Sequence, residues 1–204
     1  MKTNAKIALA ALLIASFAFD ACKKGEGDPF LSLKSRKSRM AGDWKYSAGS
    51  GTDFNGSNTS TSWTYDGTTK TSIQTISGFS PVTSKTNIAK TIKIQKDGTY
   101  TLEDITTDTS NITTYTEKGI WNFTAGIGDD KKKDHLVLRP LSETTLNTSP
   151  PTSSMTTYTG DDSPTEIFYI YQLKSKEVIL KWDGSTQSGT STASSSKGEW
   201  TLTQ

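Results

Sequence analysis

The chain has 204 residues, of which 23 are Lys or Arg and 21 are Asp or Glu, for a formal net charge of +2. The aromatic residues are not interleaved with a basic stripe, which argues against nucleic acid as a partner. With one cysteine and one histidine, Cys22 and His135, the chain excludes an internal disulfide and a zinc site of His and Cys ligands. Ser and Thr make up about three residues in ten, which favours many short strands joined by polar loops.

The N-terminus has the pattern of a secretory signal. Lys2 and Lys6 precede the apolar run Ile7–Phe19, which is too short to span a bilayer, since a span takes about 20 residues. The block Phe19-Asp20-Ala21-Cys22 resembles a bacterial lipobox, so we expect residues 1–21 to be removed and Cys22 to be acylated. The alternative is an ordinary signal peptide with an incidental cysteine, because Asp20 stands where a small uncharged residue is usual.

One domain is expected after this signal. Residues 22–29 are small, charged and turn-forming, which predicts a tether, and residues 30–204 form the domain. Asp28-Pro29 favours the start of a short helix and Gly42 its end. The helix carries a basic cluster that predicts a solvated face or, alternatively, contact with a membrane surface; its residues are Lys34, Arg36, Lys37 and Arg39.

From Asp43 onward, apolar and polar residues alternate, as is typical of half-buried strands. The clearest unit is a hairpin in which Asp97-Gly98 joins an alternating strand ending at Ile94 to one beginning near Tyr100. A second hairpin joins residues 168–173 to 178–182, and a final strand carries Trp200 and Leu202. The spacing predicts an all-β fold, a single antiparallel up-and-down barrel of about eight to ten strands, with a sandwich as the alternative.

Three segments lack this alternation and are predicted to be loops. Residues 48–62 are rich in Gly, Ser, Asn and Thr, residues 141–165 contain three prolines, and residues 184–197 are of low complexity. If the strands form a barrel, these loops would surround its mouth.

Several motifs in this order resemble the lipocalin-like lipoproteins of the Bacteroidota type. They begin with the lead-in CKKGEGDPFLSLKSRKSRMAGDW, whose Gly42 and Trp44 fit the G-x-W of the first lipocalin strand. The series KDGTY, GIWNF, a strand with Leu136 and Leu138, and YQLKSKEVILKW follows. The resemblance implies a lipocalin or calycin-like barrel, preceded by a short helix. It also implies a basic residue packed over Trp44, for which Arg139 and Lys181 are the candidates.

No constellation of catalytic or metal-ligating residues is visible. A Ser-His-Asp triad would need His135, which follows a charged run at a loop edge. Asp129-Asp130 and Asp161-Asp162 are adjacent acids without the alternating spacing of a calcium loop, so solvated charge is the expected interpretation and calcium the alternative. We therefore expect a protein that is not an enzyme and has neither a metal nor another cofactor.

If the barrel holds a cavity, aromatic residues of the alternating strands are the candidates for its lining: Tyr100, Trp121, Phe168 and Trp182. The alternative is a barrel filled by its own side chains. Trp63 and Tyr65 lie beside polar segments and could instead be exposed rings that stack on a sugar.

The function expected from these patterns is non-covalent binding of a small apolar or amphipathic molecule by a lipid-anchored protein. The alternative is a surface protein that binds a glycan or a protein through its Ser/Thr-rich loops. The membrane partner would be reached through lipid on Cys22, and the domain would be a monomer. We expect an outer-membrane lipoprotein of the cell envelope. Lys23 and Lys24 differ from the acidic residues that often follow the cysteine of surface-exported lipoproteins, which favours a protein that faces the periplasm.

Overall fold

The computed structural model describes residues 35–55, 58–125, 134–188 and 191–204, and almost all of them lie in antiparallel strands. A five-residue helix, α2 (Arg36–Met40), leads into the first strand. The strands are β1 (Gly42–Asn55), β2 (Thr59–Tyr65), β3 (Thr69–Ile76), β4 (Val82–Ile94), β5 (Thr99–Thr107), β6 (Ile112–Ala125), β7 (Asp134–Thr148), β8 (Pro151–Thr157), β9 (Glu166–Leu173), β10 (Glu177–Ser188) and β11 (Ser191–Thr203), with a 3-10 turn, η2 (Gly160–Asp162), between β8 and β9.

Ten of these strands hydrogen-bond in a closed ring. The order is β6-β5-β4-β3-β2-β1-β11-β10-β9-β7, and pairing of β7 with β6 closes it, while β8 lies outside on the edge of β7. At the base, residues 42–45 of β1 pair directly with residues 91–94 of β4. Above that point the β2–β3 hairpin separates these two strands, so the ring widens away from its base. The predicted antiparallel barrel with a short N-terminal helix is confirmed.

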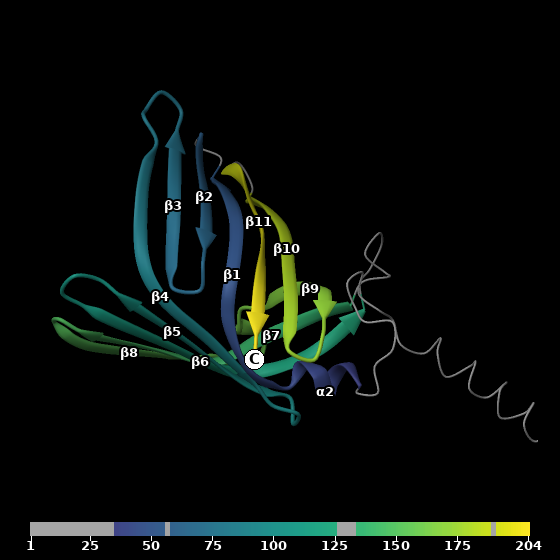
Figure 1. Cartoon of the computed structure of the whole chain (residues 1–204). Helices are drawn as coiled ribbons and strands as arrows, with labels where there is room; N and C mark the ends of the chain where they lie inside the picture. The colour runs from purple at the N-terminus through teal and green to yellow at the C-terminus, as the bar shows by residue number, and fades with distance from the viewer. Residues whose placement is uncertain (1–34, 56–57, 126–133, 189–190) are drawn as a thin grey trace, which may run out of the picture.

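Beyond the base the barrel opens into two arms (Figure 1). The upright arm comprises β1, β2, β3, β10, β11 and the first half of β4. The lateral arm comprises β5, the first half of β6, the second half of β7 and β8, and it extends to one side in the same view. Strand β9 closes the ring between them, since it pairs with β10 on one side and with β7 on the other.

The core fills the base of the barrel, where both predicted hairpins and the final strand are present. Trp44, Ile92, Tyr100, Leu138 and Leu202 are all at most 2% exposed. Asp-Gly forms the β4–β5 turn as expected: Gly98 has φ +97°, and Asp97 Oδ1 accepts hydrogen bonds from the backbone N–H and the hydroxyl of Thr99. The alternating pattern therefore located the part of each strand that packs against its neighbours.

Helix α2 closes the base of the barrel; of its predicted solvated basic face, Lys37 is exposed as expected, whereas Arg39 is buried. Met40 is fully buried, and its carbonyl accepts a hydrogen bond from Trp44 Nε1 at 2.7 Å. Arg39 is also buried and donates to the carbonyl of Leu173, while Arg36 Nε lies 3.1 Å from Asp134. Lys34 lies outside the described residues. The side chains of Arg36 and Arg39 hold the helix against strand ends, because buried guanidinium groups need hydrogen-bond acceptors.

Neither candidate for the basic residue over Trp44 has that position. The Arg139 guanidinium donates to the carbonyl of Gly160. Lys181 Nζ pairs with Glu199 at 3.4 Å and lies 4.0 Å from the Tyr171 ring centre. The Trp44 indole nitrogen instead donates its hydrogen bond to the backbone carbonyl of Met40.

The prediction of three long loops is wrong. Residues 48–62 run through β1 and β2, residues 141–165 contain the end of β7, β8 and η2, and residues 184–197 belong to β10 and β11. These segments form the outer parts of the two arms, where both faces of the sheet meet water; every described residue of β8, for example, is exposed. A strand with two solvated faces needs no alternation of apolar and polar residues, so hydrophobic periodicity in the sequence does not reveal it.

No helix in the described part of the chain is long and apolar enough to cross a membrane.

Candidate functional site

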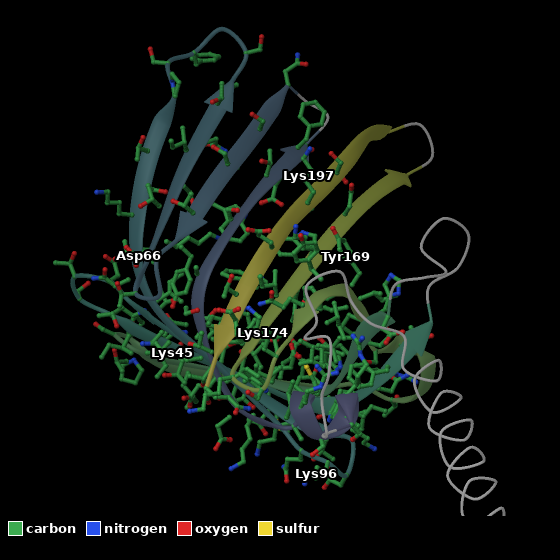
Figure 2. The ribbon with its side chains drawn as sticks, turned by 45° about the vertical axis from the view of Figure 1, so that its right-hand side comes forward. Lys45, Asp66, Lys96, Tyr169, Lys174 and Lys197 are labelled. Carbon is green, nitrogen blue, oxygen red and sulfur yellow. The ribbon has the colours of Figure 1, made fainter. Side chains whose placement is uncertain are left out.

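A pocket of about 370 Å³ lies inside the barrel where the two arms meet. It opens to solvent between the arms, and its lining residues come from β1, β4, β5, β6, β9, β10 and β11. Along β9, Glu166 and Phe168 share one face of the strand, whereas Ile167 between them is 55% exposed. Figure 2 shows side chains crowded at the base of the barrel and sparser toward the tips of the upright arm. The lining residues are Tyr46, Lys90, Leu102, Tyr115, Glu117, Glu166, Ile167, Phe168, Trp182 and Trp200.

One side of the pocket is aromatic, and we call it the aromatic wall: Tyr46, Phe168, Trp182 and Trp200. Trp182 and Trp200 stack with their ring centres 6.2 Å apart, and Phe168 meets Trp182 edge to face at 6.1 Å. Tyr46 meets Trp200 edge to face at 5.2 Å. Such arrangements stabilise rings beyond the area they bury, so the wall is held in place before any ligand arrives.

A third tryptophan and two glycines support this wall from the upright arm. Trp63 lies 4.8 Å from Trp200 and 6.0 Å from Trp182, centre to centre. A Cβ on Gly51 would come within 2.6 Å of the Trp63 ring, and one on Gly198 within 2.5 Å of the Trp182 ring. The indole rings can pack flat against the sheet because Gly51 and Gly198 have no side chain that would keep them away from it.

The opposite side of the pocket is acidic. Glu117 is only 6% exposed, and its carboxylate accepts hydrogen bonds from the hydroxyls of Tyr100 and Tyr115, the second at 2.8 Å. Glu143 of β7 stands directly across from Glu117 in the strand register. Glu166 lies at the open rim of the pocket. We call Asp104, Glu117, Glu143 and Glu166 the acidic wall.

The acidic wall changes the protonation of its neighbours. Loss of water contacts, and then the nearby charge of Glu117, raises the pKa of Glu166 above the ordinary carboxyl range. Burial, followed by the hydrogen bond to Glu117, raises the pKa of both Tyr100 and Tyr115. For Tyr46, burial and the charge of Glu166 raise the pKa. The three tyrosines therefore keep their protons, and Tyr100 and Tyr115 donate hydrogen bonds to Glu117.

Lys90 is the base among the lining residues. Its Nζ lies 3.8 Å from Asp104 Oδ2, 5.1 Å from the Tyr46 ring centre and 5.5 Å from the Trp200 ring centre. The ammonium group thus joins the aromatic wall to the acidic wall.

The structure places the four aromatic candidates at two levels. Phe168 and Trp182 line the pocket. Tyr100 and Trp121 lie lower, in the packed base, where Tyr100 donates to Glu117 and Trp121 Nε1 donates to the Gln95 carbonyl at 2.8 Å. Gly42 and Trp44 also lie at the base, in the first residues of β1.

Two aromatic residues are not where the alternative interpretation placed them. Trp63 is 6% exposed and Tyr65 is 5% exposed, so neither presents a ring to solvent for stacking on a sugar. The Tyr65 hydroxyl instead donates to the carbonyl of Ile88 at 3.0 Å. Both belong to the packing beneath the aromatic wall.

Sequence reasoning missed the polar half of the pocket. Lys90 continues the inward phase of Ile92 and Ile94, and Glu117 faces inward with Tyr115 on the same strand. A charged residue in phase with buried ones was the available signal, because such a residue must face the interior of a closed sheet.

The remaining polar candidates lie apart from the pocket. His135 is the second residue of β7 and pairs in register with Thr124 and Tyr169. Cys22 and Asp129-Asp130 lie outside the described residues, and η2 holds Asp161-Asp162. Among the residues that the structure describes, no group of three or more His, Cys, Asp or Glu side chains could hold a metal ion.

Part of the chain matches a family of known proteins. Residues 77–163 match the family model of the NlpE N-terminal domain, a family of bacterial envelope lipoproteins, rather than the lipocalin-like lipoproteins that the sequence motifs resemble. The matched segment is less than half of the chain, and it includes β4 to β8 and so all of the lateral arm. The chain matches no curated protein and no solved structure. Over this segment the chain is similar to the NlpE N-terminal domain, and the closed antiparallel barrel is consistent with a lipocalin-like fold.

Proposed function

We propose that this chain is a cell-envelope lipoprotein whose barrel binds a small amphipathic molecule non-covalently in the pocket between the arms. The observation that carries the proposal is the pocket itself: a concave space of about 370 Å³ with an aromatic wall on one side and hydrogen-bonding groups on the other. Small-molecule sites in proteins are concave, mostly apolar and supplied with a few convergent polar groups. A barrel packed solid with side chains would lack such a space.

Native mass spectrometry of the full chain purified from its own host tests this binding. The expected result is a co-purifying small molecule that is retained by the variant Phe79→Ala and lost from Phe168→Ala and Trp182→Ala. Phe79 is a matched control, because its ring is 74% exposed at the β3–β4 turn. Retention of the molecule by both pocket variants, with their melting temperatures unchanged, would place its binding elsewhere.

The proposed envelope location rests on the similarity to the NlpE N-terminal domain and on the lipobox-like block ending at Cys22. We propose that lipid on Cys22 anchors the chain in the outer membrane, facing the periplasm, and that the domain works as a monomer without catalysis. Replacing Cys22 by Ser tests the anchor: the chain should no longer incorporate labelled palmitate. Undiminished incorporation would show that another residue carries the lipid.

The structure does not favour the alternative of glycan or protein binding through long loops. The segments proposed as loops are strands of the two arms, and the two rings proposed for sugar stacking are buried. Deleting residues 141–165 would remove the end of β7, which pairs with β6, and not merely a surface loop. The pocket therefore remains the better candidate site.

A further inference from the structure

We propose that the pocket selects organic cations, that is, molecules with an ammonium-type head and an apolar or aromatic body. This inference rests on the proposed function, because it names the class of molecule that the same pocket would bind.

The charge of the pocket favours a cationic ligand. Two carboxyl groups, those of Glu117 and Glu166, line the pocket together with one base, Lys90. Beside the lining, Asp104 pairs with Lys90 and so offsets its charge, and Glu143 lies across from Glu117. Glu117 and Glu143 stand directly opposite each other on β6 and β7, an arrangement that like charges disfavour. Asp104 Oδ1 is buried and has no hydrogen-bond partner in the described part of the chain. A second positive charge would offset this excess of negative charge.

The pocket already contains one cationic group, the ammonium of Lys90. The Lys90 ammonium sits against the Tyr46 and Trp200 rings while it pairs with Asp104. Attraction of a cation to aromatic faces and to a carboxylate is the chemistry by which proteins recognise organic ammonium ligands. The arrangement around Lys90 shows that the two walls are close enough for one positive group to contact both.

The acidic and aromatic walls are separate, so they can contact different parts of one ligand. An amphipathic cation can place its head toward Glu117 and Glu166 and its apolar body against Phe168 and Trp182. An anion of the same size would have to place its charge beside Glu117 or Glu166, with Lys90 as its one cationic contact in the lining. The pocket therefore discriminates by charge as well as by shape.

Protonation of Glu166 adds a pH dependence. Glu166 faces Glu117 of β6, Glu143 of β7, Lys90 of β4 and Tyr46 of β1. Its raised pKa means that it loses its proton at a higher pH than an ordinary carboxyl group. Affinity for a cation should therefore rise as the pH rises through that pKa, while affinity for a neutral molecule should not change.

The test uses three water-soluble probes that share one aromatic ring and differ in charge: benzyltrimethylammonium, benzyl alcohol and phenylacetate. Each is titrated by calorimetry into the full chain. We expect benzyltrimethylammonium to bind about tenfold more tightly than benzyl alcohol. One partly buried contact between opposite charges is enough to give a difference in affinity of this size. Phenylacetate should bind most weakly.

Variants then assign the effect to the acidic wall. Glu117→Gln and Glu166→Gln should each weaken binding of the cation severalfold and leave binding of benzyl alcohol unchanged. Glu103→Gln is the matched control, because Glu103 lies on β5 next to Asp104 but is exposed on the opposite face. Should Glu117→Gln fail to fold, the pH dependence of the unmodified protein still decides the question.

Three outcomes count against the proposal, and they separate it from the proposed function. Equal affinity for the cation and for benzyl alcohol would overturn selection by charge while leaving the pocket as a binding site. Tightest binding of phenylacetate would show that Lys90, and not the acidic wall, sets the preference. If none of the probes binds and no molecule co-purifies, the proposed function fails together with this inference.

Discussion

Replacing Gly198 by Ala should damage both the stability of the barrel and the aromatic wall of its pocket. Gly198 lies on β11 between Gly51 of β1 and Trp182 of β10 in the strand register. An added Cβ would lie 2.5 Å from the carbonyl oxygen of Ser50 and 2.5 Å from the Trp182 ring. The first neighbour is backbone in a paired strand, so it cannot move without disturbing the ladder.

The expected loss follows from two opposing effects. Overpacking in a well-packed interior costs about 1–3 kcal/mol. A Gly→Ala change also restricts the unfolded chain, which returns about 0.4–1 kcal/mol. The net loss of about 1–2 kcal/mol corresponds to a fall in melting temperature of roughly 2–8 °C for a domain of this size. Displacement of Trp182 should in addition weaken binding in the pocket.

Thermal unfolding followed by near-ultraviolet circular dichroism measures both effects, since the stacked tryptophans contribute to that signal. Gly184→Ala is the matched control, because its nearest neighbour, the Ser196 carbonyl oxygen, would be 4.0 Å from the new Cβ. The control should melt at the wild-type temperature or slightly above it. Equal melting temperatures and equal spectra for the two variants would refute the assignment of Gly198 as the support of the Trp182 ring.

Three further predictions concern the base, the pocket rim and the turns. Met40→Ala should cost about 2–5 kcal/mol in the free energy of unfolding by urea, because Met40 is fully buried, whereas Met155→Ala, at a side chain 70% exposed, should change it by less than about 0.5 kcal/mol. Glu166→Gln should raise the melting temperature at neutral pH. The pKa of Glu166 is higher in the folded than in the unfolded state, so ionisation of Glu166 at neutral pH disfavours folding. The stability of the wild type should therefore decline as the pH rises through the raised pKa, and the variant should not show this decline. Hydrogen bonds from Thr99 lower the pKa of Asp97, so their stabilisation is present above the ordinary carboxyl pKa and is lost as the pH falls through the lowered pKa. Asp97→Asn should therefore reduce the acid limb, that is, the loss of folding stability at acid pH. An unchanged acid limb in this last variant would mean that the turn forms equally well without the charge.

Strands that are buried on one face could be predicted from the sequence, and strands solvated on both faces could not. The β4–β5 and β9–β10 hairpins were predicted because their residues alternate between a buried and a solvated face, as Ile92 and Ile94 do with Thr91 and Lys93. The same rule failed in the arms, where β8 and the far end of β3 are solvated on both faces. Threonine favours such strands through its branched Cβ, but composition alone does not separate them from loops.

The candidate site was predicted in part for the same reason. Phe168 and Trp182 were proposed from strands with clear alternation, and they line the pocket. Tyr100 and Trp121 follow the same pattern but lie in the filled base, since alternation gives the face of a residue and not its height along the barrel. Glu117 and Glu166 were missed because the sequence does not show whether a single carboxylate in a strand faces solvent or a pocket until the residues opposite it are known.

The sequence by itself determined the local properties of this protein: the all-β class, the Asp-Gly turn at residues 97–98, the inward face of the core strands and the presence of one cysteine behind an apolar run. These depend on residues close together in the chain, where side-chain period and turn chemistry act directly. Only the tertiary structure decided that α2 closes the base, that Ser/Thr-rich segments extend the barrel into two arms, and that aromatic and acidic walls face each other across a pocket. These features depend on pairing of β1 with β11, which closes the ring between segments about 150 residues apart in the chain that no local pattern brings together.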